Sequence, residues 1–128
     1  MPLVRISLRH GKPRAYRQAI ADQIYHAMRE LFEVPPDDIF ITVDELQSEN
    51  FIYSRTFFDI PRGDDFVIIQ ITAANTRGQT QKRAFYKGLV ARLSAEPGIS
   101  PDNVMINLVE VGRENWSFGR GVAQYAPG

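Results

Sequence analysis

The chain has 128 residues with 15 basic and 15 acidic side chains, so its formal net charge at neutral pH is zero. This balance does not indicate nucleic-acid binding, and the absence of cysteine excludes disulfides, thiolate nucleophiles and cysteine metal sites. No window is apolar enough to predict a membrane span and no signal peptide is recognisable, so we expect one cytoplasmic domain over residues 1–128 without a membrane partner.

The first half of the chain has the pattern of a strand, a helix and a second strand. Residues 3–8 alternate between apolar and other side chains, as a half-buried strand does. After Pro13, apolar residues recur at steps of three and four, which predicts an amphipathic helix. The turn residues PPDD at 35–38 then lead to a strand expected over 39–43. Elements of this length predict a right-handed βαβ unit with parallel strands.

The second half repeats this order. A strand with alternating valine and isoleucine is expected from residue 67, and a helix is expected after Gly78. The turn SPDN at 100–103 precedes a last strand, expected over 104–109. Shifting the chain against itself by 65 residues aligns the two halves without gaps. The clearest aligned stretches are 2–7 with 67–72, 34–43 with 99–108, and 49–55 with 114–120.

We interpret this match as a tandem duplication, with repeats of about 2–55 and 67–120. Two βαβ units related by a pseudo-two-fold axis predict an α/β fold (α+β by some schemes): a four-stranded mixed sheet with both helices on one face. The other sheet face would then carry an apolar surface that water disfavours, and its burial against further subunits predicts an oligomer. The residues expected on that face are Leu3, Phe40, Ile68 and Met105.

Pro2 stands directly before the first strand, and it has two interpretations. Proline lacks the N–H of a sheet ladder and is tolerated at strand starts, so Pro2 could simply begin the strand. Alternatively, removal of Met1, which is common before a small residue, would expose a secondary amine able to act as an acid or a base. The second interpretation requires a pocket around the amine.

Several segments together resemble the tautomerase superfamily, in particular its malonate semialdehyde decarboxylase-like branch. They are the N-terminal MPL, FEVPPDD, QKRAFY and NWSFGRG, within the duplicated βαβ order. The resemblance implies a cofactor-independent and metal-free enzyme, assembled as a homotrimer, that acts on a small carboxylate. It also implies that Pro2 is the catalytic amine and that Arg77 holds the substrate carboxylate. Trp116 and Phe118 would wall the pocket, and Asp38 would orient water near the proline.

Asn75 departs from the decarboxylase pattern, which carries an arginine at this position as well as at that of Arg77. A single arginine favours keto–enol tautomerisation of a small 2-oxo or enol carboxylic acid. Decarboxylation or hydration of a small 3-oxo acid such as malonate semialdehyde is a second possibility, with Arg55 or Arg120 as a further cation. A non-catalytic binding or assembly module of ferredoxin-like order is a third, since a fold does not define a function.

Overall fold

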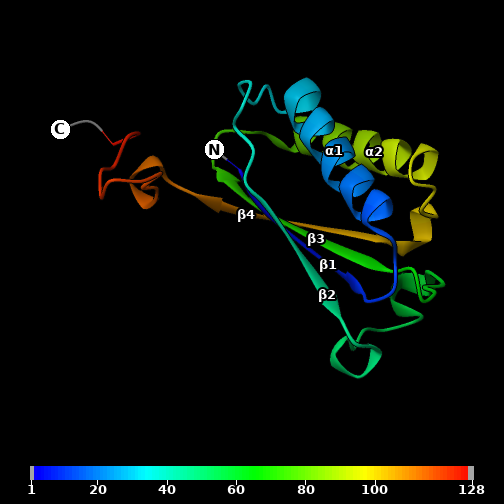
Figure 1. Cartoon of the computed structure of the whole chain (residues 1–128). Helices are drawn as coiled ribbons and strands as arrows, with labels where there is room; N and C mark the ends of the chain where they lie inside the picture. Colours follow the sequence, from blue (N-terminus) through cyan, green and yellow to red (C-terminus); the bar gives the residue numbers. More distant parts are fainter. Residues whose placement is uncertain (1, 127–128) are drawn as a thin grey trace.

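The computed structural model describes residues 2–126, so Met1 and the question of its removal lie outside the described residues. The chain forms four strands and two long helices in the order β1–α1–β2–β3–α2–β4, with short 3-10 turns between them (Figure 1). The elements are β1 (Leu3–Arg9), α1 (Arg14–Leu31), β2 (Ile41–Leu46), β3 (Val67–Ala74), α2 (Gln79–Ala95) and β4 (Val104–Val111).

The four strands make one mixed sheet in the order β2-β1-β3-β4. The outer pairs β1/β2 and β3/β4 are parallel, and the central pair β1/β3 is antiparallel. Both helices cover the same face of this sheet (Figure 1). The expected tandem βαβ fold, with a mixed sheet and two helices on one face, is therefore confirmed.

The pairing of strands within each half follows the same 65-residue shift. Val4 pairs with Ile41 in the first half, and Ile69 pairs with Ile106 in the second. Each residue of the second pair lies 65 positions after its counterpart in the first. The two βαβ units therefore share their hydrogen-bonding register as well as their order of elements.

The core lies between the sheet and the helices. Alternate residues of β1 and β3 point toward the helices and are buried, as the period of two in their apolar pattern predicts. The ring of Phe32, just after α1, stacks on Phe85 of α2 with centroids 4.0 Å apart. Gly88 lets the helices approach closely, because a Cβ there would lie 2.5 Å from the Leu31 side chain. Buried helix residues facing the sheet are Ile20, Ile24, Ala27 and Met28 from α1 and Phe85, Leu89 and Leu93 from α2.

Two strand boundaries differ from the sequence expectation. Strand β2 begins at Ile41 and not at Ile39, because the Ile39 N–H is donated to the Asp37 carbonyl (2.9 Å) inside the preceding turn. Asp37 itself adopts a positive φ of 67°, which keeps this turn tight. Strand β4 extends to Val111 because it continues to pair with β3 as far as Ala74.

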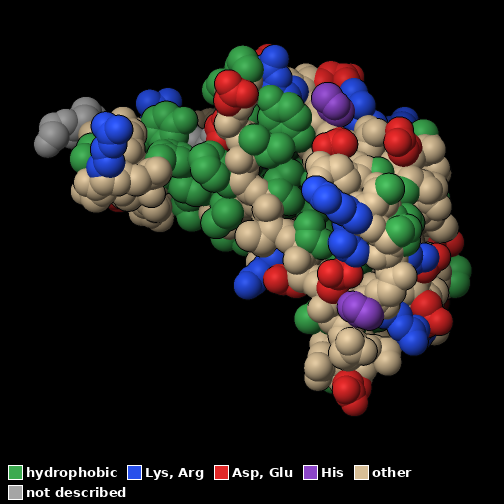
Figure 2. Space-filling model, in the orientation of Figure 1, with side chains coloured by type: hydrophobic (Ala, Val, Ile, Leu, Met, Phe, Trp, Pro, Cys, Tyr) green, Lys and Arg blue, Asp and Glu red, His purple; other side chains and the backbone are tan. Residues whose placement is uncertain are grey.

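The sheet face away from the helices carries the predicted apolar surface. Leu3, Phe40 and Met105 keep 46%, 47% and 48% of their surface exposed, although all three are large apolar residues. Hydrophobic side chains gather where β4 leaves the body of the molecule toward the C-terminal segment (Figure 2). No helix within residues 2–126 is long and apolar enough to cross a bilayer.

Candidate active site

The sheet topology brings the predicted site residues to one end of the molecule. Because β1 and β3 are antiparallel, the start of β1 lies beside the end of β3, where Leu3 pairs with Thr72. The start of β2 is beside the start of β1, and the end of β4 is beside the end of β3. Pro2, the turn before β2, the loop after β3 and the segment after β4 therefore all lie at this end.

A cavity of about 490 Å³ opens at this end, and Pro2 forms part of its wall. Pro2 is a buried residue of this wall. Aromatic and aliphatic side chains dominate the lining, and the polar groups are few, as in most small-molecule sites. The lining residues are Pro2, Leu3, Phe40, Thr72, Val111, Asn115, Trp116, Ser117 and Phe118.

Trp116 and Phe118 form one wall of the cavity. Their rings are parallel to within 6°, with centroids 5.3 Å apart. The ring centroid of Phe118 also lies 5.9 Å from that of Phe40 and 5.2 Å from that of Tyr125, whose ring is perpendicular to it. The backbone N–H of Phe118 is donated to the Gln124 side chain (2.9 Å). The contact with Phe40 joins the C-terminal segment to the turn before β2, while most of the segment projects from the body of the molecule (Figure 1). The Trp116 Nε1 atom is buried and finds no acceptor within the described residues.

Arg77 follows β3 at the same end but does not line the cavity. Its Nη2 donates to the carbonyl of Phe32 (2.9 Å), and its guanidinium group lies over the Phe32 ring, 4.5 Å from the centroid. Burial lowers the pKa of Arg77, whereas the carboxylates of Glu110 and Glu33 act in the opposite direction. Arginine stays protonated in proteins, so this group is a half-buried cation anchored to the end of α1.

Asn75 and Asp38 lie near the cavity without lining it. The Asn75 side chain is exposed, and its backbone N–H is donated to the carbonyl of Val111 (3.2 Å), which is itself a lining residue. Asp38 is half-buried in the turn before β2, and its N–H is donated to the Pro35 carbonyl (3.3 Å). The structure thus gathers Pro2, Trp116 and Phe118 around one space and leaves Arg77, Asn75 and Asp38 at its margin.

The two further arginines that could supply a second cation, Arg55 and Arg120, are not among the lining residues of the Pro2 cavity. Arg55 follows β2, and it pairs with Asp64 (2.9 Å) while its guanidinium group lies over the Tyr53 ring. Arg120 is exposed in the C-terminal segment, between two glycines, with a positive φ of 61°. Neither arginine lines the cavity within its own chain.

Sequence reasoning missed three polar residues of the cavity wall: Thr72, Asn115 and Ser117. Thr72 could have been found from the 65-residue shift, since the implied two-fold axis places it opposite Leu3. Asn115 and Ser117 flank Trp116 in the segment NWSF, so their position beside an expected pocket residue is the signal that could have found them. All three supply donors or acceptors beside Pro2.

Comparison with known proteins identifies the family. Two family models, both described as tautomerase enzyme, match residues 2–56 and 43–119. The chain is 33% identical to "Probable tautomerase YusQ" of Bacillus subtilis (strain 168) over 97% of its own length and 98% of the relative's. It is 30% identical to "Probable tautomerase YrdN" of the same organism, over 100% of its own length and 98% of the relative's.

Solved structures give the same assignment. A malonate semialdehyde decarboxylase, described as having decarboxylase and hydratase activities, superposes with a TM-score of 0.90 at 32% identity, covering 96% of this chain and 95% of that one. A second such decarboxylase, inhibited by 3-bromopropiolate, gives a TM-score of 0.90 at 29% identity, with coverage of 96% and 93%. A fused 4-OT symmetric trimer shares the fold at 14% identity, with a TM-score of 0.79 and coverage of 97% and 99%.

These relatives are named as enzymes, so the alternative of a non-catalytic module is set aside. Family models, full-length relatives and superposed folds all agree with the fold described above. The chain therefore belongs to the tautomerase superfamily and is an enzyme of the tautomerase type.

Proposed function

We propose that this enzyme catalyses keto–enol tautomerisation of a small 2-oxo or enol carboxylic acid, with the N-terminal amine of Pro2 as the proton carrier. The observation that supports the proposal most directly is the position of Pro2: it is buried in the wall of an apolar cavity of about 490 Å³ that the Trp116–Phe118 stack encloses. The proposal requires that Met1 be removed, because an amide nitrogen has no basicity.

The environment of Pro2 suits a base. An α-amino group titrates near ~8 in model peptides, and burial among apolar side chains lowers the pKa of an amine by disfavouring its charged form. A neutral amine near physiological pH can remove a proton from C3 of a 2-oxo acid. The C–H bonding electrons then form the C2–C3 double bond, the carbonyl oxygen is protonated, and the enol results. In the reverse direction the ammonium form of Pro2 returns the proton to C3.

Arg77 supplies the charge for holding the substrate carboxylate. Within residues 2–126 its guanidinium group donates one hydrogen bond, to the Phe32 carbonyl, so other donors of its planar fork remain for a carboxylate. Desolvation strengthens such a pair. We propose that the substrate spans the distance from Pro2 to Arg77, with Asn75 donating a hydrogen bond and Asp38 orienting water beside the proline.

We also propose that the enzyme is a homotrimer. Leu3 and Phe40 belong both to the exposed apolar sheet face and to the cavity wall, so burial of this face by neighbouring copies would also complete the cavity. The structural neighbours that share this fold include fused 4-OT proteins described as trimers. The assembly would place further side chains over the opening above Pro2.

Deuterium exchange tests the proposed reaction. A tautomerase that forms the enol of a 2-oxo acid exchanges the C3 protons of that acid with solvent, which NMR follows in D2O with pyruvate and 2-oxobutanoate as probes. We expect exchange well above the buffer rate with the native enzyme. The same rate in enzyme and buffer, across a panel of 2-oxo acids at millimolar concentration, would contradict the proposal.

Decarboxylation or hydration of a small 3-oxo acid is the second candidate. The 32% identity and TM-score of 0.90 to a malonate semialdehyde decarboxylase favour it, whereas the neutral Asn75 beside Arg77 weighs against it. This reaction requires a cationic Pro2 amine that polarises the substrate carbonyl or donates a proton. Release of CO2 from malonate semialdehyde, without C3 exchange of 2-oxo acids, would select this candidate over the tautomerase.

A further inference from the structure

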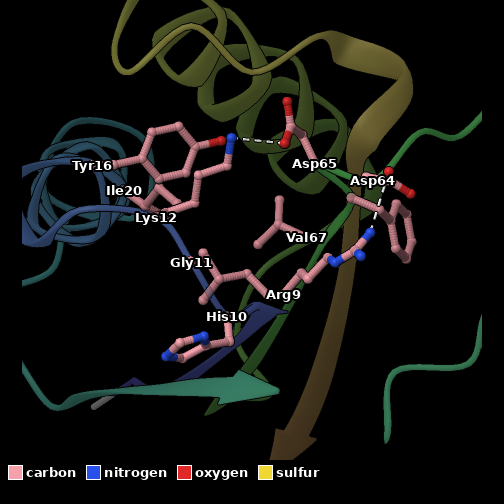
Figure 3. Close-up of a pocket in the computed structure, with 11 residues that line it drawn as sticks. Arg9, His10, Gly11, Lys12, Tyr16, Ile20, Asp64, Asp65 and Val67 are labelled. Carbon is pink, nitrogen blue, oxygen red and sulfur yellow. Dashed lines mark ion pairs between the residues drawn. The ribbon is translucent and has the colours of Figure 1, made fainter. Parts of the chain in front are cut away.

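A second pocket, of about 300 Å³, lies at the opposite end of β1 from Pro2. Figure 3 shows it from the side of its charged residues: Lys12 reaches toward Asp65, and Arg9 reaches toward Asp64. The Lys12 Nζ is 2.7 Å from Asp65, and the Arg9 Nη1 is 3.2 Å from Asp64. Tyr16 and Ile20 of α1 and Val67 of β3 complete the wall.

This pocket is the internal counterpart of the corner that holds Pro2 and Arg77. Under the 65-residue shift Lys12 corresponds to Arg77, His10 to Asn75, and Val67 to Pro2. The counterpart of the proline is thus an internal, buried residue that can never present an amine, while the counterpart of the arginine is still a cation. The pocket keeps the charge suited to a carboxylate and lacks the group suited to proton transfer.

The linker that precedes β3 lines one side of this pocket with Asp64, Asp65 and Phe66. Gly63 is held by three hydrogen bonds: its N–H is donated to the Asn103 side chain (2.8 Å), and its carbonyl accepts from the Tyr53 hydroxyl (2.6 Å) and from the Phe66 N–H (3.4 Å). These bonds hold the next residues over the pocket, so that Asp65 meets Lys12. Asn103 is itself the counterpart of Asp38 under the shift.

Lys12 and Tyr16 are two donors of the pocket that a carboxylate could contact. The hydrogen bond to Asp65 raises the pKa of Lys12, so the ammonium group stays charged. Burial raises the pKa of the Tyr16 phenol, which therefore stays protonated and able to donate. The Lys12 ammonium also lies 4.9 Å from the centre of the Tyr16 ring.

We propose that this second pocket is a binding site for small monocarboxylates, and that the side chain of Asp65 occupies it as an intramolecular competitor. A tethered carboxylate has a high effective concentration, so a free acid must exceed it to bind. The pair is nevertheless displaceable, because the Lys12 and Asp65 side chains keep 34% and 54% of their surface exposed and exposed ion pairs contribute little. Each chain would then carry one open catalytic site and one self-occupied carboxylate site. The inference rests on the proposed function only for the role of Arg77.

Propionate binding tests this proposal without any measurement of activity. Propionate is a monocarboxylate with no oxo group, and its binding is followed by the NMR shifts of the Lys12 Hε and Tyr16 ring protons. In Asp65→Ala the competitor is gone, and we expect saturable shifts with an affinity roughly three- to tenfold higher than in the unsubstituted enzyme. Asp65→Ser provides a second variant in case the alanine variant folds poorly.

Two matched variants define the controls. Glu30→Ala removes an exposed carboxylate that is paired with Arg92 outside this pocket, so its propionate affinity should equal that of the unsubstituted enzyme. Lys12→Met combined with Asp65→Ala should lose the gain in affinity. Equal affinities in Asp65→Ala, Asp65→Ser and the unsubstituted enzyme, or an equal gain in Glu30→Ala, would overturn the proposal. Because the shifts are read at Lys12 and Tyr16, failure of the tautomerase proposal at Pro2 would leave this result unchanged.

Discussion

Arg5 and Gln70 face each other across the central antiparallel strand pair, and they are 65 residues apart. The neighbouring pairs, Val4 with Ile71 and Ile6 with Ile69, exchange with each other under the same shift. The pseudo-two-fold axis of the chain therefore passes between Arg5 and Gln70. It relates two similar ends of the sheet, of which only the one at Pro2 can present a terminal amine.

A retained residue before Pro2 should abolish activity. If an alanine is inserted between Met1 and Pro2, removal of Met1 leaves the Pro2 nitrogen as an amide. We expect the C3 exchange rate of a 2-oxo acid to fall by about 10²- to 10⁴-fold, the usual contribution of a general acid–base group. Thermal unfolding should be unchanged. A fully active insertion variant would exclude the Pro2 amine as the proton carrier.

Arg77 should affect substrate binding beyond its effect on stability. We expect Arg77→Ala to reduce kcat/KM by roughly 10- to 100-fold, because a charge-assisted pair with the carboxylate is lost. Arg77→Lys should recover only part of the loss, since lysine lacks the planar fork. Steady-state kinetics with a 2-oxo acid measures both effects.

Arg29→Ala is the matched control for Arg77→Ala. Arg29 also donates to a backbone carbonyl just after α1, that of Val34 (2.8 Å), as Arg77 does to that of Phe32 (2.9 Å). Both variants should lose about 0.5–1.5 kcal/mol of unfolding free energy, but only Arg77→Ala should lose substrate affinity. If the two variants were equally active, Arg77 would be only a structural residue.

Trp116 and Phe51 occupy corresponding positions of the two repeats, but only Trp116 should affect substrate binding. Trp116 and its counterpart Phe51 lie at opposite ends of the sheet. The Phe51 ring packs on the rings of Tyr53 and Phe66, with centroids 4.8 Å and 6.0 Å away. Trp116→Ala removes a wall of the Pro2 cavity, so KM should rise by about tenfold as apolar contact is lost. Phe51→Ala should lower the denaturant midpoint and leave KM within about twofold. An equal rise in KM for both would show that packing alone is responsible.

Much of the fold could be predicted because the apolar pattern is strong where the core is. The alternation in β1 and β3 and the stripe on α1 follow directly from burial on one face. The start of β2 could not be predicted. The Ile39 N–H is donated to Asp37 inside the turn and not to a neighbouring strand, and the pattern of apolar residues does not indicate such a local hydrogen bond.

The candidate site was predictable only in part. Pro2, Trp116 and Phe118 converge on one cavity as expected, and Thr72 joins them because the antiparallel register places it opposite Leu3, as the 65-residue shift implies. The hydrogen bond of Arg77 to the Phe32 carbonyl depends on where α1 ends relative to the loop after β3, a tertiary relationship. The catalytic roles of these residues remain predictions.

Assembly should depend on the exposed sheet face. We expect the native enzyme to sediment as a trimer and Met105→Glu to shift it toward monomer, because a carboxylate is costly to bury at an apolar interface. The control is Ala84→Glu, which makes the same charge change on an exposed position of α2. Sedimentation velocity distinguishes them. A trimeric Met105→Glu variant would show that the interface lies elsewhere. A monomeric native enzyme would contradict the proposed trimer.

Asp64 should contribute to stability in a pH-dependent way. Its hydrogen bond from Arg55, followed by the charge of Arg9, holds the pKa of this carboxyl below its ordinary value of 3.8. A lowered pKa means that the contribution is present above 3.8 and is lost as the pH falls through the folded-state value. Asp64→Asn should therefore narrow the difference in melting temperature between pH 6 and pH 3, and 1 M salt should reduce this effect. If Asp64→Asn left the difference in melting temperature between pH 6 and pH 3 unchanged at low salt, the proposed contribution of Asp64 would be contradicted.

Titration of the N-terminal amine, together with the intact mass of the native protein, tests the central claim most directly. The account predicts a mass short by one methionine and a Pro2 amine that titrates near or below ~7, against a reference near ~8. A processed chain whose amine titrates well above neutrality would contradict the tautomerase and favour the decarboxylase or hydratase. A mass that includes Met1 on most chains would contradict any catalytic role for Pro2.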